Sequence, residues 1–143
     1  MGRKKYEEQK RKRSPGGYCA VNHDFLRSET VNSLNYKASK LFLQILSQYS
    51  GYNNGDFCIT WSLMRKQNWR SKQTLDRARK ELLDKGIIEI TRWGGLNRAQ
   101  LYALTLYSVD ECKGKLDVKP STYPKNIWRK NESVPILKKL PVR

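Results

Sequence analysis

The apolar positions between residues 36 and 49 repeat with the period of an α-helix. They fall three and four residues apart, at Ala38, Leu41, Phe42, Ile45, Leu46 and Tyr49. Such a stripe lies on one face of an amphipathic helix and packs against the rest of a domain. Glycine and asparagine at residues 51–55 then end the pattern. We predict a helix here, preceded over residues 24–34 by a short helix or turn that packs on the domain.

The next segment predicts two helices joined by a short turn. Thr60 is a suitable N-cap for a helix that reaches about Gln67, and residues 68–70 form the connection. Ser71 caps a second helix, which runs to about Lys85 and stops at Gly86. Its expected buried positions recur at helical spacing: Leu75, Ala78, Leu82 and Leu83.

After residue 86 the hydrophobic period changes from that of a helix to that of a strand. Residues 87–93 and 101–107 predict two strands joined by a glycine-containing hairpin over 94–98, and residues 57–59 predict a brief third strand. The fold class is therefore α+β, mainly helical. The order of elements is that of a winged helix-turn-helix with a two- to three-stranded antiparallel sheet.

Basic charge is concentrated at both ends of the chain. Residues 1–13 hold seven Lys and Arg side chains, and Ser14, Pro15 and two glycines then break any helix. We expect a basic flexible arm over 1–17, the folded domain over 18–118, and a basic extended tail over 119–143. The arm has two interpretations, a solubilising tail or a segment that binds phosphates.

The overall charge restricts the kind of partner. The chain has 29 Lys and Arg against 13 Asp and Glu, a net charge of +16, which attracts DNA, RNA or an acidic membrane surface. It lacks the apolar run of about 18 residues that spans a membrane. The apolar stretch of a signal peptide is missing as well. We expect a cytoplasmic protein that is nucleoid-associated when bound to DNA, with no membrane partner.

The helix that begins after Ser71 has side chains suited to reading bases. With Leu75 and Leu82 facing the core, Gln73 and Arg77 lie on the opposite side and Thr74 flanks them. Gln pairs with adenine, Arg with guanine, and Thr with several bases. An ordinary solvated helix face is the alternative. Residues 60–80 weigh against it, because they carry seven positive side chains and one negative.

Other polar residues of this region are candidates for phosphate contacts. They are Arg65, Lys66, Arg70, Ser71, Lys72 and Lys80 on the helices and turn, and Arg92 and Arg98 on the hairpin. Three tryptophans could stack on bases, although core packing is the favoured interpretation: Trp61, Trp69 and Trp93.

The sequence shows no convincing pattern for catalysis or for a metal. Glu111 and Lys113 have the spacing found in some nucleases, but no third carboxylate accompanies them and Asp110. Cys19, Cys58 and Cys112 fit neither a zinc pattern nor a disulfide framework. We expect no enzyme, no metal and no cofactor.

Several segments resemble small winged helix-turn-helix proteins of bacterial prophages and mobile elements. The resemblance covers about residues 22–118 and is carried by residues 54–58, 61–64, 69–75, 81–88, 91–92, 94–95 and 101–105. It implies a winged-helix domain of the type also found in replication initiators and transcription regulators.

We therefore expect a sequence-specific double-stranded DNA-binding protein. It would regulate transcription or take part in replication of a phage or mobile element, as a homodimer or in tandem. One alternative is an interaction module that docks a protein partner through its first helix or C-terminal tail. Another is an RNA binder, although the deep, narrow groove of A-form RNA does not admit a helix.

Overall fold

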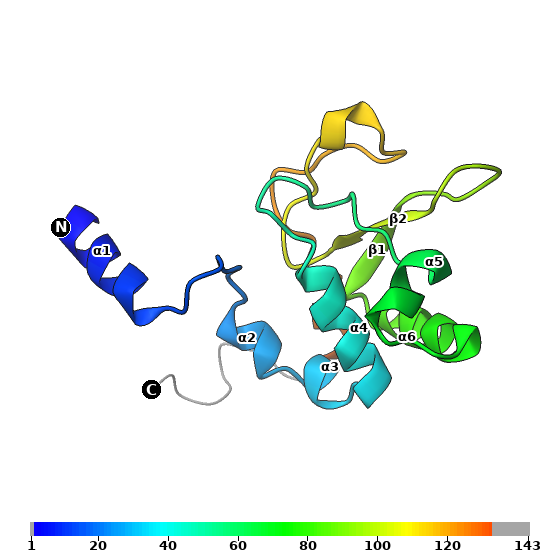
Figure 1. The fold of residues 1–143 in the computed structure, drawn as a ribbon, viewed down its shortest axis with the longest axis horizontal. Helices are drawn as coiled ribbons and strands as arrows, with labels where there is room; N and C mark the ends of the chain where they lie inside the picture. The colour runs from blue at the N-terminus through cyan, green and yellow to red at the C-terminus, as the bar shows by residue number, and fades with distance from the viewer. Residues whose placement is uncertain (1, 133–143) are drawn as a thin grey trace.

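The computed structural model describes residues 2–132 as an α+β fold with a two-stranded antiparallel sheet. Its α-helices are α1 (Gly2–Lys12), α2 (His23–Leu26), α3 (Glu29–Asn32), α4 (Tyr36–Leu46), α5 (Trp61–Met64) and α6 (Lys72–Asp84). The strands are β1 (Ile88–Arg92) and β2 (Leu101–Leu104). Three 3₁₀ helices complete the order: η1 (Arg65–Gln67), η2 (Cys112–Gly114) and η3 (Ile127–Asn131). Figure 1 shows the sheet beside α4, α5 and α6, with α1 standing apart. None of the helices over residues 2–132 is long and apolar enough to span a membrane.

Helix α4 forms where the apolar stripe predicts it. Asn35 caps its start, because its side-chain oxygen accepts the Lys37 N–H at 2.9 Å. The buried side chains are those of the stripe: Ala38, Leu41, Phe42, Ile45 and Leu46. Tyr49 lies just beyond the helix and stacks on Tyr107, with 4.3 Å between ring centroids. The expected short helical segment upstream is present as α2 and α3.

Helix α6 begins and ends as predicted. Ser71 is the N-cap, and its hydroxyl accepts the Thr74 N–H at 3.2 Å. Gly86 follows the helix with φ of +75°, the left-handed conformation that glycine adopts without strain. Helix α5 is shorter than expected, a single turn that continues as η1. Thr60 occupies its N-cap position but makes no capping hydrogen bond.

The two strands pair antiparallel, with Ile88 opposite Leu104 and Ile90 opposite Tyr102. The third strand expected at residues 57–59 is reduced to one isolated bridge, between Phe57 and Tyr102.

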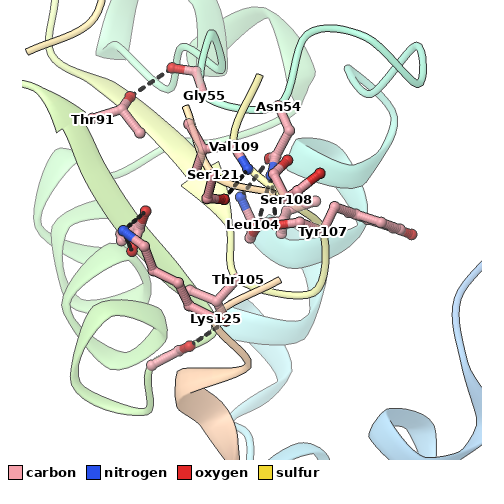
Figure 2. A network of polar contacts seen from close by, with 12 residues as sticks. Asn54, Gly55, Thr91, Leu104, Thr105, Tyr107, Ser108, Val109, Ser121 and Lys125 are labelled. Atoms are coloured by element: carbon pink, nitrogen blue, oxygen red, sulfur yellow. Dashed lines mark hydrogen bonds and ion pairs between the residues drawn. The ribbon is translucent and has the colours of Figure 1, made fainter. Parts of the chain in front are cut away.

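Strand β2 ends at Leu104, three residues before the predicted end at 107. It ends there because the buried side chain of Asn54 hydrogen-bonds to the backbone of residues 104–108. Its Oδ1 accepts the Leu104 N–H at 2.8 Å. Its Nδ2 donates to the carbonyls of Leu104, Tyr107 and Ser108 at 2.9–3.1 Å (Figure 2). These bonds satisfy backbone groups that would otherwise require a continuing ladder.

The expectation of an extended tail from residue 119 is wrong as far as residue 132. Trp128 on η3 is fully buried, and its ring lies edge-on to Phe25. Thr30 Oγ1 donates to the Trp128 carbonyl at 2.9 Å, and the Glu132 carboxylate accepts the Thr30 N–H at 3.2 Å. One large aromatic side chain thus anchors a segment whose composition is that of a tail. The rest of the expected tail, residues 133–143, lies outside the described residues.

The N-terminal arm is also more ordered than expected. Residues 2–12 form α1, in which no residue is buried. The predicted break is correct, because Gly16 and Gly17 follow with φ of +116° and +82°. The structure therefore presents this basic segment as an exposed helix and not as an irregular arm.

Candidate nucleic-acid interface

Helix α6 has one face in the core and one in solvent, as its sequence predicts. Leu75, Ala78 and Leu82 are buried. On the opposite side Gln73, Arg77 and Lys80 are exposed, and Thr74 is half-buried. The three candidate base-reading residues therefore lie at the solvent-facing start of the helix.

The charges of α6 divide into paired and unpaired groups. Three basic side chains have acidic neighbours on the same helix or just beyond it: Arg79 with Asp76 at 3.0 Å, Lys80 with Asp84 at 3.9 Å and Lys85 with Glu81 at 3.8 Å. In contrast, the side chains of Lys72, Gln73 and Arg77 form no hydrogen bond or ion pair with other residues of the described range. Two cations and one amide at the beginning of α6 are thus available to a ligand.

Two adjoining hollows lie along the junction between the start of α6 and α4. One, of about 310 Å³, is lined by Lys37, Lys40, Asn68, Trp69, Arg70, Ser71 and Thr74. The other, of about 330 Å³, is lined by Asn35, Lys37, Ala38, Thr74, Arg77, Ala78 and Glu81. They share Lys37 and Thr74, so the basic side chains of α4, of the turn and of α6 border one continuous surface. We call Lys37, Lys40, Arg70 and Arg77 the basic rim.

Lys37 and Lys40 were missed by the sequence analysis. They lie three residues apart at the border of the apolar stripe of α4, a spacing that places two side chains on neighbouring parts of one helix face. That spacing was the available signal, but it does not say which other helix the two lysines would face.

The turn between η1 and α6 is tied to α4 by polar contacts. Trp69 is buried, and its Nε1 donates to Gln44 Oε1 at 2.6 Å. Lys40 Nζ donates to the Asn68 carbonyl at 3.0 Å and lies 4.9 Å from the centroid of the Trp69 ring. These contacts fix the entry of α6 relative to α4. The expected core role of Trp69 is confirmed.

The remaining phosphate candidates of the helical region lie in solvent. Arg65 and Lys66 are exposed on η1, and Arg70 and Lys72 are exposed on either side of Ser71. The Ser71 hydroxyl is occupied as the cap of α6. The structure therefore gathers Arg70 and Arg77 on the basic rim, and leaves Arg65 and Lys66 on η1.

On the β1–β2 hairpin, both candidate arginines have protein partners. The Arg92 guanidinium donates to the Ala99 carbonyl through Nε at 3.1 Å and Nη2 at 2.8 Å. Arg98 pairs with Asp117 at 2.6 Å. The Asp117 carboxylate also accepts the Trp93 N–H at 2.9 Å, and this bond, aided by Arg98, lowers the pKa of Asp117. Both guanidinium groups thus brace the hairpin.

Trp93 does not pack in the core as expected, since 64% of its side chain is exposed. The strand register shifts between Ile90 and Arg92, and Trp93 lies beyond the last paired residue. Among the described residues, no strand pairs with it. Trp61 is half-buried and packs against the core.

The residues considered for catalysis and metal binding are dispersed or occupied. Asp110 accepts the Asn54 N–H at 2.8 Å, whereas Glu111 is exposed. The three cysteines are free. Within residues 2–132, no three His, Cys, Asp or Glu side chains are grouped so that they could hold a metal ion.

Comparisons of the chain with protein-family models, with curated proteins and with solved structures give no match in any of the three. What this surface binds has to follow from its own geometry and chemistry.

Proposed function

We propose that the protein is a winged helix-turn-helix protein that binds double-stranded DNA with α6 in the major groove. One observation carries the proposal: Gln73 and Arg77 are exposed on the first turns of α6, and neither side chain pairs with another residue of the described range. The major groove is about 12 Å wide and admits an α-helix, and its base edges match the amide and guanidinium groups. In this assignment α5, η1 and the turn brace α6, and the β1–β2 hairpin is the wing.

Contacts to bases and contacts to phosphates have different consequences for binding. Gln73, Thr74 and Arg77 would hydrogen-bond to bases and give sequence preference. Lys37, Arg70 and Lys72 would contact phosphates on one side of α6, and Arg65 and Lys66 would do so from η1. Phosphate contacts position the protein and give affinity without reading sequence. The net charge of +16 adds long-range attraction to the duplex.

The biological role that fits this chemistry is site-specific control of a short DNA region. We propose a transcription regulator or an accessory replication factor of a phage or mobile element, in the cytoplasm and associated with the nucleoid. The resemblance to prophage and mobile-element proteins supports this assignment. A homodimer on two half-sites would double the contacts made by one α6.

A protein-docking role is the second candidate, because α4 exposes two large apolar side chains. Tyr36 is 91% exposed and Leu43 is 63% exposed. They lie seven residues apart, which places them on the same side of the helix. Lys40 lies between them in sequence and contributes to the basic rim. The same surface thus offers both an apolar and a cationic contact.

Selection of bound fragments from random duplex DNA, followed by binding measurements on the selected site, tests the proposal. Arg77→Ala should lower affinity for that site by about 1–3 kcal/mol and relax the preference at one base pair. Arg77→Lys keeps the charge but not the two-pronged hydrogen bond, so affinity for other sequences should hold while preference falls.

The matched control is Lys130→Ala. It also removes one positive charge, but from η3, which lies near the C-terminal end of α6. Gly86, the residue at which α6 stops, lies against Ile127 of η3. This variant should leave the preference unchanged. If folded Arg77→Ala keeps the affinity and preference of the native protein, α6 does not read DNA and the docking role is favoured. Preferential binding of single-stranded or duplex RNA would favour the alternative of an RNA-binding protein.

A further inference from the structure

The loop of the β1–β2 hairpin presents a leucine to solvent. The backbones of Gly95 and Arg98 are joined by two hydrogen bonds, of 2.9 and 3.1 Å, which leave Leu96 and Asn97 as the two loop residues. Hairpin loops of this length favour asparagine, aspartate and glycine. Leu96 is nevertheless 95% exposed, so its apolar side chain gains nothing from burial in the free protein.

Polar contacts link the two arms of the hairpin that carries Leu96. The Asp117 carboxylate binds the Trp93 N–H of one arm and the Arg98 guanidinium of the other. Arg92 reaches across to the Ala99 carbonyl. Figure 1 shows the loop projecting away from the helices and from the rest of the sheet. A braced, projecting loop can hold a side chain in place against a partner at little entropic cost.

The surroundings of Leu96 favour a polyanionic partner. Residues 92–100 contain Arg92 and Arg98 and no acidic residue. The carboxylates near the stem of the hairpin are paired with cations, Asp117 with Arg98 and Glu89 of β1 with Lys125. Trp93 adds a second exposed apolar group next to the stem. A single leucine and a single tryptophan are a small area for a protein interface, which usually buries about 800 Å² per partner.

We propose that Leu96 is an apolar wedge that enters the minor groove next to the α6 site, separates two stacked base pairs and bends the duplex. Leucine is among the side chains that minor-groove proteins insert between base steps, and the insertion kinks DNA by about 20–90°. The inference rests on the proposed function, in which the hairpin is the wing and reaches a neighbouring groove when α6 lies in the major groove. In this inference the hairpin changes the shape of the DNA. The guanidinium groups of Arg92 and Arg98 alone would not do so.

The test measures binding and bending separately on the selected duplex. Bending is followed by energy transfer between dyes at the two DNA ends, and unstacking by the fluorescence of 2-aminopurine placed at successive steps beside the site. The native protein should bring the ends closer and raise the fluorescence at one step. Leu96→Ala should abolish both signals while changing affinity by no more than about tenfold, because the wedge gains apolar burial but also costs unstacking.

Two variants serve as controls. Leu26→Ala removes another solvent-exposed leucine, from α2, and should keep the native bend. Leu96→Met keeps a flexible apolar side chain of similar length and should restore most of the bend.

The outcomes distinguish this inference from the proposed function. If the native protein binds the duplex without bending it, or if Leu96→Ala still bends it, Leu96 is not a wedge. Either result leaves intact the proposal that α6 binds the major groove. If the native protein does not bind the duplex pool at all, both proposals are wrong.

Discussion

The indole of Trp128 stands edge-on to the ring of Phe25, with 5.2 Å between centroids and 81° between ring planes. This contact joins η3, near the end of the described chain, to α2. The Trp128 carbonyl is bound by Thr30 of α3 as well, so the indole and its backbone both hold the two ends of the domain together.

Replacing Trp128 therefore tests whether the segment after β2 belongs to the folded unit. Trp128→Ala should lower the free energy of unfolding by about 3–5 kcal/mol, the usual cost of truncating a buried aromatic side chain. Trp128→Phe should cost less, because it keeps the edge-on ring. Urea denaturation followed by circular dichroism measures both changes. Trp93→Ala, which truncates an exposed tryptophan, is the control and should leave the midpoint nearly unchanged.

The basic rim predicts how DNA affinity changes with salt. If about 5–8 cations contact phosphates, the slope of log K against log salt should be about −5 to −7, and each lost contact should reduce its magnitude by about 0.9. Lys37→Ala and Lys66→Ala should each show that reduction and weaken all sequences about equally. Lys130→Ala should keep the native slope. An unchanged slope in Lys37→Ala would mean that the rim does not lie on the DNA backbone.

The Asp117 bridge predicts local opening of the hairpin in acid. The folded-state pKa of Asp117 lies below its ordinary value, with the Trp93 hydrogen bond as the main cause. The ionised carboxylate therefore stabilises the folded hairpin fully at pH values above the ordinary aspartate pKa. This stabilisation is lost as pH falls through the lowered pKa.

At neutral pH, Asp117→Asn should speed amide exchange at residues 93–98 without a large change in melting temperature, because the pair is exposed. Hydrogen exchange read by mass spectrometry measures this effect. Asp84→Asn removes another exposed carboxylate, paired with Lys80 at 3.9 Å, and should leave hairpin exchange as in the native protein. Equal exchange in the two variants would argue against the bridge.

Tyr107 predicts a loss of stability in alkali. Burial, together with Cys19 and Tyr49, raises its pKa to about 12, and its hydroxyl donates to the Ala20 carbonyl. The folded-state pKa lies above the ordinary value of 10.0. The protonated Tyr107 hydroxyl therefore contributes fully to the free energy of unfolding below pH 10.0, and this contribution is lost as pH rises toward about 12. Chemical denaturation at a series of alkaline pH values measures this loss.

In Tyr107→Phe the free energy of unfolding should depend less on pH over that range. Tyr52→Phe, at an exposed tyrosine, should keep the native dependence. A native-like profile in Tyr107→Phe would show that another group causes the loss.

Elements whose signals are local could be predicted from the amino-acid sequence. The apolar stripe defined α4, and Ser71 and Gly86 defined the ends of α6, because helical periodicity and caps depend on residues within a few positions of one another. The same periodicity placed Gln73 and Arg77 in solvent. The pairing of the two strands also followed from local signals, the change of period and the glycines between them.

Contacts between residues far apart in the chain could not be predicted in this way. Trp128 joins the core through Phe25, although the residues around it have the composition of a tail. Asn54 ends β2 through bonds to residues 104–108, and Lys37 of α4 comes to border the same surface as Thr74 of α6. Local periodicity states which face of an element is buried, but not which partner covers it. That choice depends on how side chains far apart in sequence fill one volume and satisfy each other's polar groups.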